Sequence, residues 1–273
     1  MNTTLDEKKF YDGRFTTSFD YDLNNPIYRI YLQHSIYRAD WLSFSWIRPA
    51  RRILDIGCGG GKKILKEKAQ RVVGMDLSLE SLKRAADLYD WVVVASADAL
   101  PFKTNVFDCI YSAHLIGHIP PDRKRQVLEN VWRVTAKGGE NIHYVETDGD
   151  NFAVRFAKRS PDLYQKNFIE INGHFGLERP SAAIGRIKDF FRILQCKKFN
   201  SGIYSVEGTL ILFEGYQDKN LILKCLWPIY RWINQFSLIR RFVNLLLGPI
   251  MRIYNQWTPF DEGDWILVRC VKD

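Results

Sequence analysis

A glycine-rich turn directly after a short apolar run limits the folds open to this chain more than any other feature. Residues 53–56 have the pattern of a buried strand, and the turn after them has glycine at alternate positions: Gly57, Gly59 and Gly61. Glycine has no Cβ, so such a turn can take positive φ and lets a ligand approach the backbone at the carboxyl end of a strand. The turn alone is a weak sign, because glycines also build ordinary tight turns.

Short apolar runs alternate with helix-like stretches from Arg51 onward. This alternation implies right-handed strand–helix–strand crossovers and a buried parallel sheet. Strands are therefore predicted at residues 52–56, 71–76, 91–95, 107–112, 141–146 and 265–271. Between the last two, an irregular or helical insertion is expected at 148–180, a helix capped by Ser181 from Ser181 to Leu194, and strand-like material at 199–213.

Asp76 strengthens the interpretation of the glycine turn. This acid lies 19 residues after Gly57, at the end of the second predicted strand. A carboxylate there can accept hydrogen bonds from both hydroxyls of a ribose, which suits an adenosine-containing cofactor. The alternative is that Asp76 only caps the helix predicted to start near Ser78.

The chain resembles class I S-adenosylmethionine-dependent methyltransferases, in particular the type 11 group that includes ubiquinone/menaquinone and sterol C-methyltransferases. The resemblance lies in five successive segments: residues 53–61, 72–78, 97–102, 107–119 and 129–139. It implies a Rossmann-like α/β methyltransferase fold, with a mostly parallel seven-stranded sheet and helices on both faces. One departure is the turn at 135–139, which reads Thr-Ala-Lys-Gly-Gly where the family usually has Leu-Lys-Pro-Gly-Gly.

The resemblance also implies S-adenosylmethionine as the cofactor and a set of contacts to it. Asp55 would orient the amino acid end, Asp76 would bind the ribose, and Asp98 would meet the adenine amino group with Ala99 beside the ring. The full predicted set is Asp55, Gly57, Cys58, Gly59, Gly61, Asp76, Leu77, Asp98, Ala99 and Ser112. A dinucleotide-binding turn would place a third glycine at position 62, where this chain has Lys62.

Three side chains near the ends of the fourth and fifth predicted strands are candidate catalytic residues: His114, His118 and Glu146. Methyl transfer needs mainly positioning and exclusion of water, and a base only when the acceptor must lose a proton. A histidine can serve as that base, although both histidines also suit structural roles. His143 lies mid-strand and is expected in the core. No metal site is predicted.

Residues 219–260 form the most unusual stretch, with six basic residues, no acidic residue and many Leu, Ile and Trp. A helical wheel places Lys224, Arg231 and Asn234 on a narrow face and apolar side chains around the rest. We expect a basic amphipathic helical insertion that contacts an anionic membrane surface. Burial on the core or in a homodimer is the alternative. Gly248-Pro249 is expected to break a second helix.

Charge and cysteine content complete the expectations. The 273 residues carry a formal charge of +8, and the five cysteines show no paired spacing. That pattern indicates neither a disulfide framework nor a zinc cage. Residues 1–14 have no apolar core for secretion, so a cytoplasmic, or peripheral membrane, location is expected.

We therefore predict three regions: a helical N-terminal cover at 1–50, the cofactor-binding domain at 51–218 and 261–273, and the insertion at 219–260. The function predicted is methyl transfer to carbon or oxygen of a small hydrophobic or lipid-like acceptor. The alternatives are an RNA or protein methyltransferase and a non-catalytic cofactor-binding module. DNA is not expected as a partner, because the motifs of base-methylating enzymes are missing: residues 112–115 read Ser-Ala-His-Leu.

Overall fold

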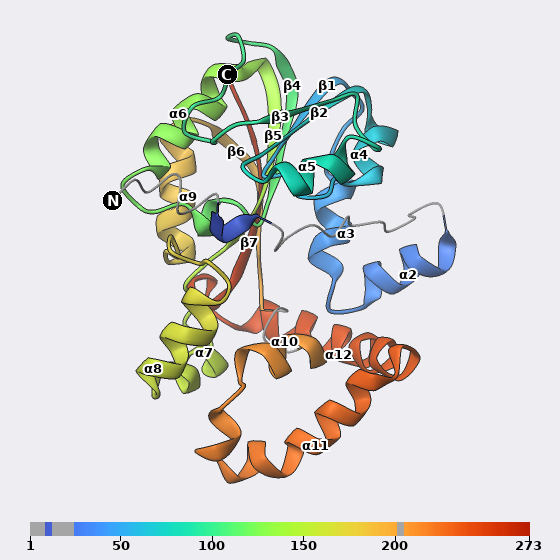
Figure 1. The fold of residues 1–273 in the computed structure, drawn as a ribbon, viewed down its shortest axis with the longest axis vertical. Helices are drawn as coiled ribbons and strands as arrows, with labels where there is room; N and C mark the ends of the chain where they lie inside the picture. The colour runs from blue at the N-terminus through green and yellow to red at the C-terminus, as the bar shows by residue number, and fades with distance from the viewer. Residues whose placement is uncertain (1–8, 13–24, 201–204) are drawn as a thin grey trace.

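The computed structural model describes residues 9–12, 25–200 and 205–273 of the chain. Within them, seven strands form one sheet in the order β3-β2-β1-β4-β5-β7-β6 (Figure 1). β7 pairs antiparallel with β5 and β6, and the other neighbours are parallel. The strands are β1 (Ala50–Ile56), β2 (Ala69–Asp76), β3 (Trp91–Val94), β4 (Phe107–Ala113), β5 (Thr135–Glu146), β6 (Arg192–Phe199) and β7 (Trp265–Val271). The predicted Rossmann-like methyltransferase fold is confirmed.

Helices cover both faces of the sheet and extend beyond its carboxyl edge (Figure 1). The α-helices are α2 (Pro26–His34), α3 (Arg38–Ser45), α4 (Lys63–Lys68), α5 (Leu79–Ala85), α6 (Lys124–Val134), α7 (Phe152–Lys158), α8 (Pro161–Tyr164), α9 (Pro180–Lys188), α10 (Val206–Leu212), α11 (Leu221–Gln235) and α12 (Ser237–Trp257). Three 3₁₀ helices, η1 (Ile116–His118), η4 (Tyr216–Asp218) and η5 (Phe260–Glu262), and one π-helix, η2 (Gln165–Glu170), are also present in the described ranges.

Alternation along β1 divides the hydrophobic core between the two faces of the sheet. Leu54 and Ile56 belong to the cluster that α6 and α9 complete, whereas Ile53 belongs to the cluster completed by α3, α4 and α5. Successive side chains of a strand point to opposite faces, so one short run supplies both clusters. The predicted N-terminal cover contributes α2 and α3, and its residues 1–8 and 13–24 lie outside the described residues.

The predictions for residues 181–213 are wrong in three places. The helix α9 ends at Lys188, and β6 begins at Arg192, inside the helix expected to run to Leu194. Ser181 is not an N-cap: its backbone N–H and hydroxyl both donate to the carboxylate of Asp261, at 2.8 and 2.9 Å. A tertiary partner thus replaces the local cap.

The strand expected within 199–213 is not found in the described part of that range, apart from its first residue. β6 ends at Phe199, where its pairing with β7 ends. β7 lies more than sixty residues later in the chain, so the local sequence does not define this boundary. Val206–Leu212 forms α10, whose N-cap Ser205 accepts a hydrogen bond from the backbone N–H of Gly208 at 2.7 Å. Residues 201–204 of that prediction lie outside the described part of the chain.

The predicted break at Gly248-Pro249 is wrong, since α12 continues through both residues. Gly248 serves packing instead: a Cβ there would overlap the carbonyl oxygen of His34 at the end of α2. The neighbouring backbone confirms the close approach, because the N–H of Ile36 donates to the carbonyl of Asn244 at 3.3 Å. No helix in the described ranges is long and apolar enough to cross a membrane.

We predict that Gly248→Ala lowers the thermal unfolding midpoint. The helix propensity gained, about 1 kcal/mol, is smaller than the ~1–3 kcal/mol expected for an overpacked contact. Gly185→Ala is the matched control, because a Cβ on that residue of α9 meets nothing within 4 Å. It should raise the midpoint. Equal shifts of the same sign in both variants, measured by circular dichroism, would contradict the packing of α12 on α2.

Candidate cofactor and acceptor site

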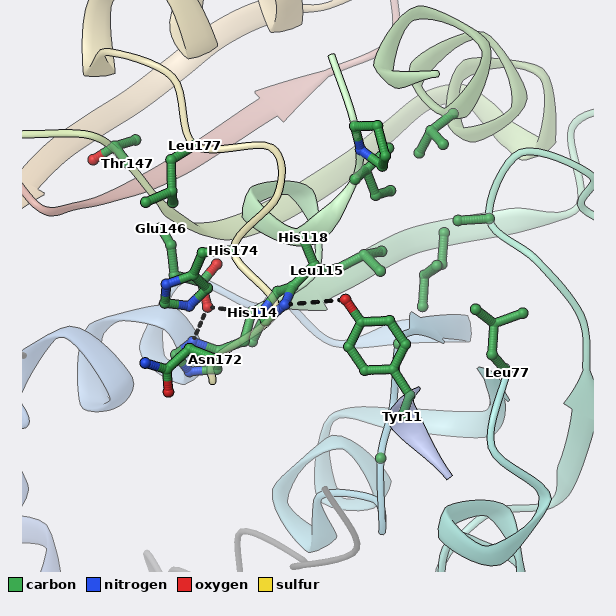
Figure 2. A pocket seen from close by; sticks show the side chains of 18 of the residues that line it. Tyr11, Leu77, His114, Leu115, His118, Glu146, Thr147, Asn172, His174 and Leu177 are labelled. Carbon is green, nitrogen blue, oxygen red and sulfur yellow. Dashed lines mark hydrogen bonds and ion pairs between the residues drawn. The ribbon is translucent and has the colours of Figure 1, made fainter. Parts of the chain in front are cut away.

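A cavity of about 480 Å³ opens at the carboxyl ends of β1, β2, β4 and β5 (Figure 2). Its wall runs from the glycine turn past Asp76 to Asp98 and, on the other side, to His114 and Glu146. This edge of a parallel sheet, beside the point where the strand order reverses, is where open α/β folds bind ligands.

The glycine turn is held across the end of β2 by its backbone. The N–H groups of Gly57 and Cys58 both donate to the carbonyl of Met75, at 2.8 and 3.0 Å. Gly57 and Gly59 have φ of +67° and +55°, the left-handed region that residues with a Cβ rarely adopt. The turn therefore faces the cavity with backbone and almost no side chain. Gly61 also has positive φ but packs on Ala85 outside the cavity wall.

Asp76 lies where the sequence predicted, on the cavity wall beside Leu77. Its carboxylate accepts hydrogen bonds from the backbone N–H groups of Gly59 and Ser78, both at 2.9 Å. It does not replace the helix cap, since the hydroxyl of Ser78 itself caps α5 by accepting from the N–H of Ser81. A carboxylate accepts about four hydrogen bonds, so two positions remain for a ligand.

Asp55 is fully buried and lies outside the cavity wall. Its Oδ2 accepts hydrogen bonds from Lys62 Nζ at 3.2 Å and from the hydroxyl of Tyr89 at 2.7 Å. Burial raises the pKa of Asp55, and Lys62 and Tyr89 partly offset this. Lys62 itself lines the cavity, so the ion pair lies directly behind the glycine turn.

Asp98 lines the opposite part of the cavity and pairs with Arg123, whose Nε donates at 2.8 Å. Burial alone raises the pKa of the Asp98 carboxyl, but hydrogen bonds from Ser96 and Arg123 hold it below its usual value. Ala99 follows it outside the cavity wall. Side chains of α6 fix this loop, because Gln126 and Asn130 donate to the Asp98 carbonyl.

Ser112 also lies outside the cavity wall. Its side chain is 2% exposed, and its hydroxyl is 2.8 Å from His143 Nδ1. Burial lowers the pKa of His143 to about 4, so this ring is neutral and belongs to the core, as expected.

The candidate catalytic residues converge at one end of the cavity, on the carboxyl ends of β4 and β5 (Figure 2). Glu146 Oε1 is 2.8 Å from His114 Nδ1 and 3.5 Å from His118 Nε2. Burial alone raises the pKa of the Glu146 carboxyl, but the two histidines hold it well below its usual value. His114 has φ of +58°, a strained conformation for a residue with a Cβ.

Sequence reasoning missed His174, which lines the same end of the cavity. The ring centroids of His118 and His174 are 4.9 Å apart. His174 lies in the segment 148–180, which was interpreted only as an insertion, and no spacing ties it to Glu146 along the chain. Tyr11 also reaches this end, with its hydroxyl 3.3 Å from His118 Nδ1.

Comparison with known proteins identifies the central segment. Residues 53–139 match a family model described as a methyltransferase domain. This chain contains a class I S-adenosylmethionine-dependent methyltransferase domain. A malonyl-[acyl-carrier protein] O-methyltransferase from Legionella pneumophila is 40% identical over 85 residues, which are 28% of this chain and 29% of that protein.

Two further relatives show how widely the methyltransferase domain is shared. A tRNA (carboxymethyluridine(34)-5-O)-methyltransferase from Arabidopsis thaliana is 32% identical over 88 residues, 32% of this chain and 22% of that one. An uncharacterised methyltransferase from Synechocystis is 31% identical over 97 residues, 34% and 46% of the two chains. The chain spans less than half the length of these relatives. The resemblance to the ubiquinone/menaquinone and sterol group stays a prediction.

Solved structures agree on the fold of the methyltransferase domain. The N-methyltransferase NodS from Bradyrhizobium japonicum, in complex with S-adenosyl-L-homocysteine, aligns over 98% of both chains with a TM-score of 0.51 and 13% identity. The [4+2]-cyclase SpnF aligns over 96% of this chain and 84% of its own, with a TM-score of 0.51 and 14% identity. At these identities the likeness shows the fold, and the chemistry must be argued from the site.

The cofactor of this domain class is S-adenosylmethionine, and the side chains present fit it. The zwitterionic amino acid end needs a cation and backbone groups, which Lys62 and the bare turn at Gly59 can supply. The ribose needs hydrogen-bond acceptors, which Asp76 supplies. The remaining wall around Asp98 combines the small apolar side chains of Ala95 and Ala97 with the Asp98–Arg123 pair, so a purine ring would meet apolar surface beside polar groups.

We predict that Asp76→Ala lowers the affinity for S-adenosyl-L-homocysteine at least about tenfold, because hydrogen bonds to a charged group contribute about 1.5–3 kcal/mol each. Isothermal titration calorimetry measures this, with Asp87→Ala as control. Asp87 is an exposed acid two residues after the end of α5, outside the cavity wall. Unchanged affinity in Asp76→Ala would remove this residue from the cofactor site.

Proposed function

We propose that this chain transfers the methyl group of S-adenosylmethionine to a small hydrophobic or lipid-like acceptor at the surface of an anionic membrane. The observation that supports it most is the single cavity itself. It joins the glycine turn and Asp76 at one end to His114, His118 and Glu146 at the other, and much of its wall is apolar.

The proposed cofactor contacts follow the predicted set with two changes of role. Gly57, Cys58, Gly59, Asp76, Leu77 and Asp98 line the cavity and are proposed to contact the cofactor directly. Asp55 is proposed to act through Lys62, which it holds by a buried ion pair. Gly61, Ala99 and Ser112 are proposed to shape the turns and strand behind the wall.

S-adenosylmethionine supplies a methyl group on a positively charged sulfur, and transfer to an acceptor lone pair breaks that carbon–sulfur bond and leaves a neutral thioether. The contribution of the chain is to align the acceptor and keep water out. We propose that His114, His118 and Glu146 contact the polar group of the acceptor. Ile211 and Leu212 of α10 line the cavity and suit the acceptor's apolar part.

The hairpin of α11 and α12 supports a membrane location. It extends from the end of the molecule opposite the C-terminus (Figure 1). No residue of α11 is buried. Large apolar side chains stand exposed along both helices: Leu221, Ile229, Trp232, Leu238, Ile250 and Trp257. A monomeric soluble protein rarely exposes so many large apolar side chains on two neighbouring helices.

The charges of the hairpin favour a membrane as the covering partner. The stretch 219–260 has six basic residues and no acidic one. Arg231 and Asn234 face a shallow pocket that Glu214 also lines, so part of the polar face of α11 turns toward the protein and leaves apolar side chains outward. Helices with this composition bind at the headgroup level of anionic bilayers. Because α10 contacts α11 and lines the cavity, an acceptor embedded in lipid has a short path to the site.

Methyl transfer is tested with S-adenosylmethionine carrying a tritiated methyl group. The protein is incubated with total lipid extract in anionic vesicles, with total RNA, or with soluble protein extract, and label is counted in each fraction. Label in the lipid fraction is the expected result. Label in RNA or protein instead would overturn the proposed acceptor, and no label anywhere despite bound cofactor would indicate a non-catalytic module.

We predict that Glu146→Gln lowers kcat about a hundredfold or more, because removing one group that orients the reacting atoms typically costs that much. Affinity for S-adenosyl-L-homocysteine should change less than about twofold, since Glu146 lies at the acceptor end. Single-turnover kinetics and calorimetry on the same samples separate the two effects. An equal loss of cofactor binding would contradict the division of the cavity into two ends.

We predict that Leu238→Glu weakens binding to phosphatidylglycerol-containing vesicles at least about tenfold. The variant loses about 1.5–3 kcal/mol of apolar burial and gains a repelled charge. Leu79→Glu is the matched control, an exposed leucine on α5. Sedimentation with vesicles measures binding, and light scattering reports oligomeric state. A stable dimer without vesicle binding, dispersed by Leu238→Glu, would show that the apolar surface covers a second copy.

A further inference from the structure

Three histidines surround the buried carboxylate at the acceptor end, and two of them form a compact group with it. One ligand atom each from His118, Glu146 and His174 lies within 4.8 Å of the others. The three residues come from η1, the end of β5 and the loop before α9, so the fold brings together groups far apart in the chain (Figure 2).

Backbone contacts determine which ring nitrogens carry hydrogen. His118 Nδ1 is 3.0 Å from the carbonyl oxygen of Gly173, and His174 Nδ1 is 2.9 Å from that of Phe168. A carbonyl oxygen can only accept, so each Nδ1 carries the proton and donates. In the neutral rings the Nε2 atoms therefore present lone pairs. Histidines that bind metals are commonly oriented in this way, by a hydrogen bond from the other nitrogen to a carbonyl.

A cation bound among these groups would stabilise the buried carboxylate. Glu146 Oε1 already lies 2.8 Å from His114 Nδ1 and 3.5 Å from His118 Nε2. The second oxygen of Glu146, Oε2, is buried and has no hydrogen-bond partner. Leaving an ionised buried carboxylate only partly compensated is costly.

We propose that His118, Glu146 and His174 bind a divalent transition-metal ion such as Zn²⁺. Two imidazoles and one carboxylate form a known ligand set for zinc with an open position, and imidazole nitrogen selects such ions over Mg²⁺ and Ca²⁺. Zinc–nitrogen distances of about 2.0–2.1 Å require the three groups to draw closer together.

The metal site also narrows the acceptor class. This step rests on the proposed function, because it assumes that the acceptor occupies this end of the cavity. An ion with an open position there would bind an oxygen of the acceptor, such as a hydroxyl or carboxylate, and align it toward the cofactor end. Metal binding itself does not depend on methyl transfer.

The test is a calorimetric Zn²⁺ titration of the whole 273-residue chain after chelator treatment, with Mg²⁺ as the contrasting ion. The background variant Cys225→Ser removes an exposed thiol that could bind zinc. One equivalent of Zn²⁺ is expected to bind with micromolar or tighter affinity, and Mg²⁺ is expected not to compete. His174→Ala should weaken zinc binding at least tenfold, whereas His34→Ala, on α2 and exposed, should leave it unchanged.

Affinity for S-adenosyl-L-homocysteine is measured on the same samples. Retained cofactor binding in His174→Ala shows that the variant is folded and that the loss is specific to the metal. Absence of stoichiometric Zn²⁺ binding, or binding that His174→Ala does not weaken, would overturn the metal site and leave a shared proton between His118 and Glu146. Zinc binding without cofactor binding would instead count against the proposed methyl transfer and not against the metal site.

Discussion

The glycine-turn side of the cavity depends on the carbonyl of Met75. This carbonyl accepts hydrogen bonds from the N–H groups of Gly57 and Cys58, and so ties the turn after β1 to the end of β2. Because the next residue is Asp76, the same contact places its carboxylate against the N–H of Gly59. Two adjacent parallel strands thereby build one concave wall, with bare backbone on one side and a carboxylate on the other. That arrangement requires glycine at φ of +67° and +55°.

The sequence correctly predicted those strands and turns that are determined by residues close together in the chain. Apolar runs bounded by turns located β1 to β5, and the spacing from Gly57 to Asp76 identified two residues that line the same cavity. The errors arose where partners lie far apart in sequence. Asp261 takes the place of a cap at Ser181, and pairing with β7 turns residues from Arg192 onward into a strand. His174 lines the cavity beside His118 and Glu146 through a loop whose position no periodicity encodes.

The buried charges around the cavity have partners that could not be identified from residue types alone. Asp55 was predicted to orient the amino acid end of the cofactor. The structure buries it outside the cavity wall, in an ion pair with Lys62, which lines the cavity. Glu146 is surrounded by imidazoles, so its charge is retained at a position where burial alone would neutralise it. Asp55 positions the ammonium group of Lys62, and Glu146 positions the imidazole rings of His114 and His118. These partners all line the cavity. The apolar hairpin of α11 and α12 follows the opposite rule, with its hydrophobic side chains outside.

Hydrogen–deuterium exchange with and without S-adenosyl-L-homocysteine tests the central claim most directly, because it reads every part of the cavity in one measurement. The two-ended cavity predicts slower exchange in the turn at 57–59, at 76–78 and at 95–98, with little change in the hairpin at 221–257. Protection confined to the hairpin, or none in the glycine turn at saturating ligand, would contradict the assignment of the cofactor end.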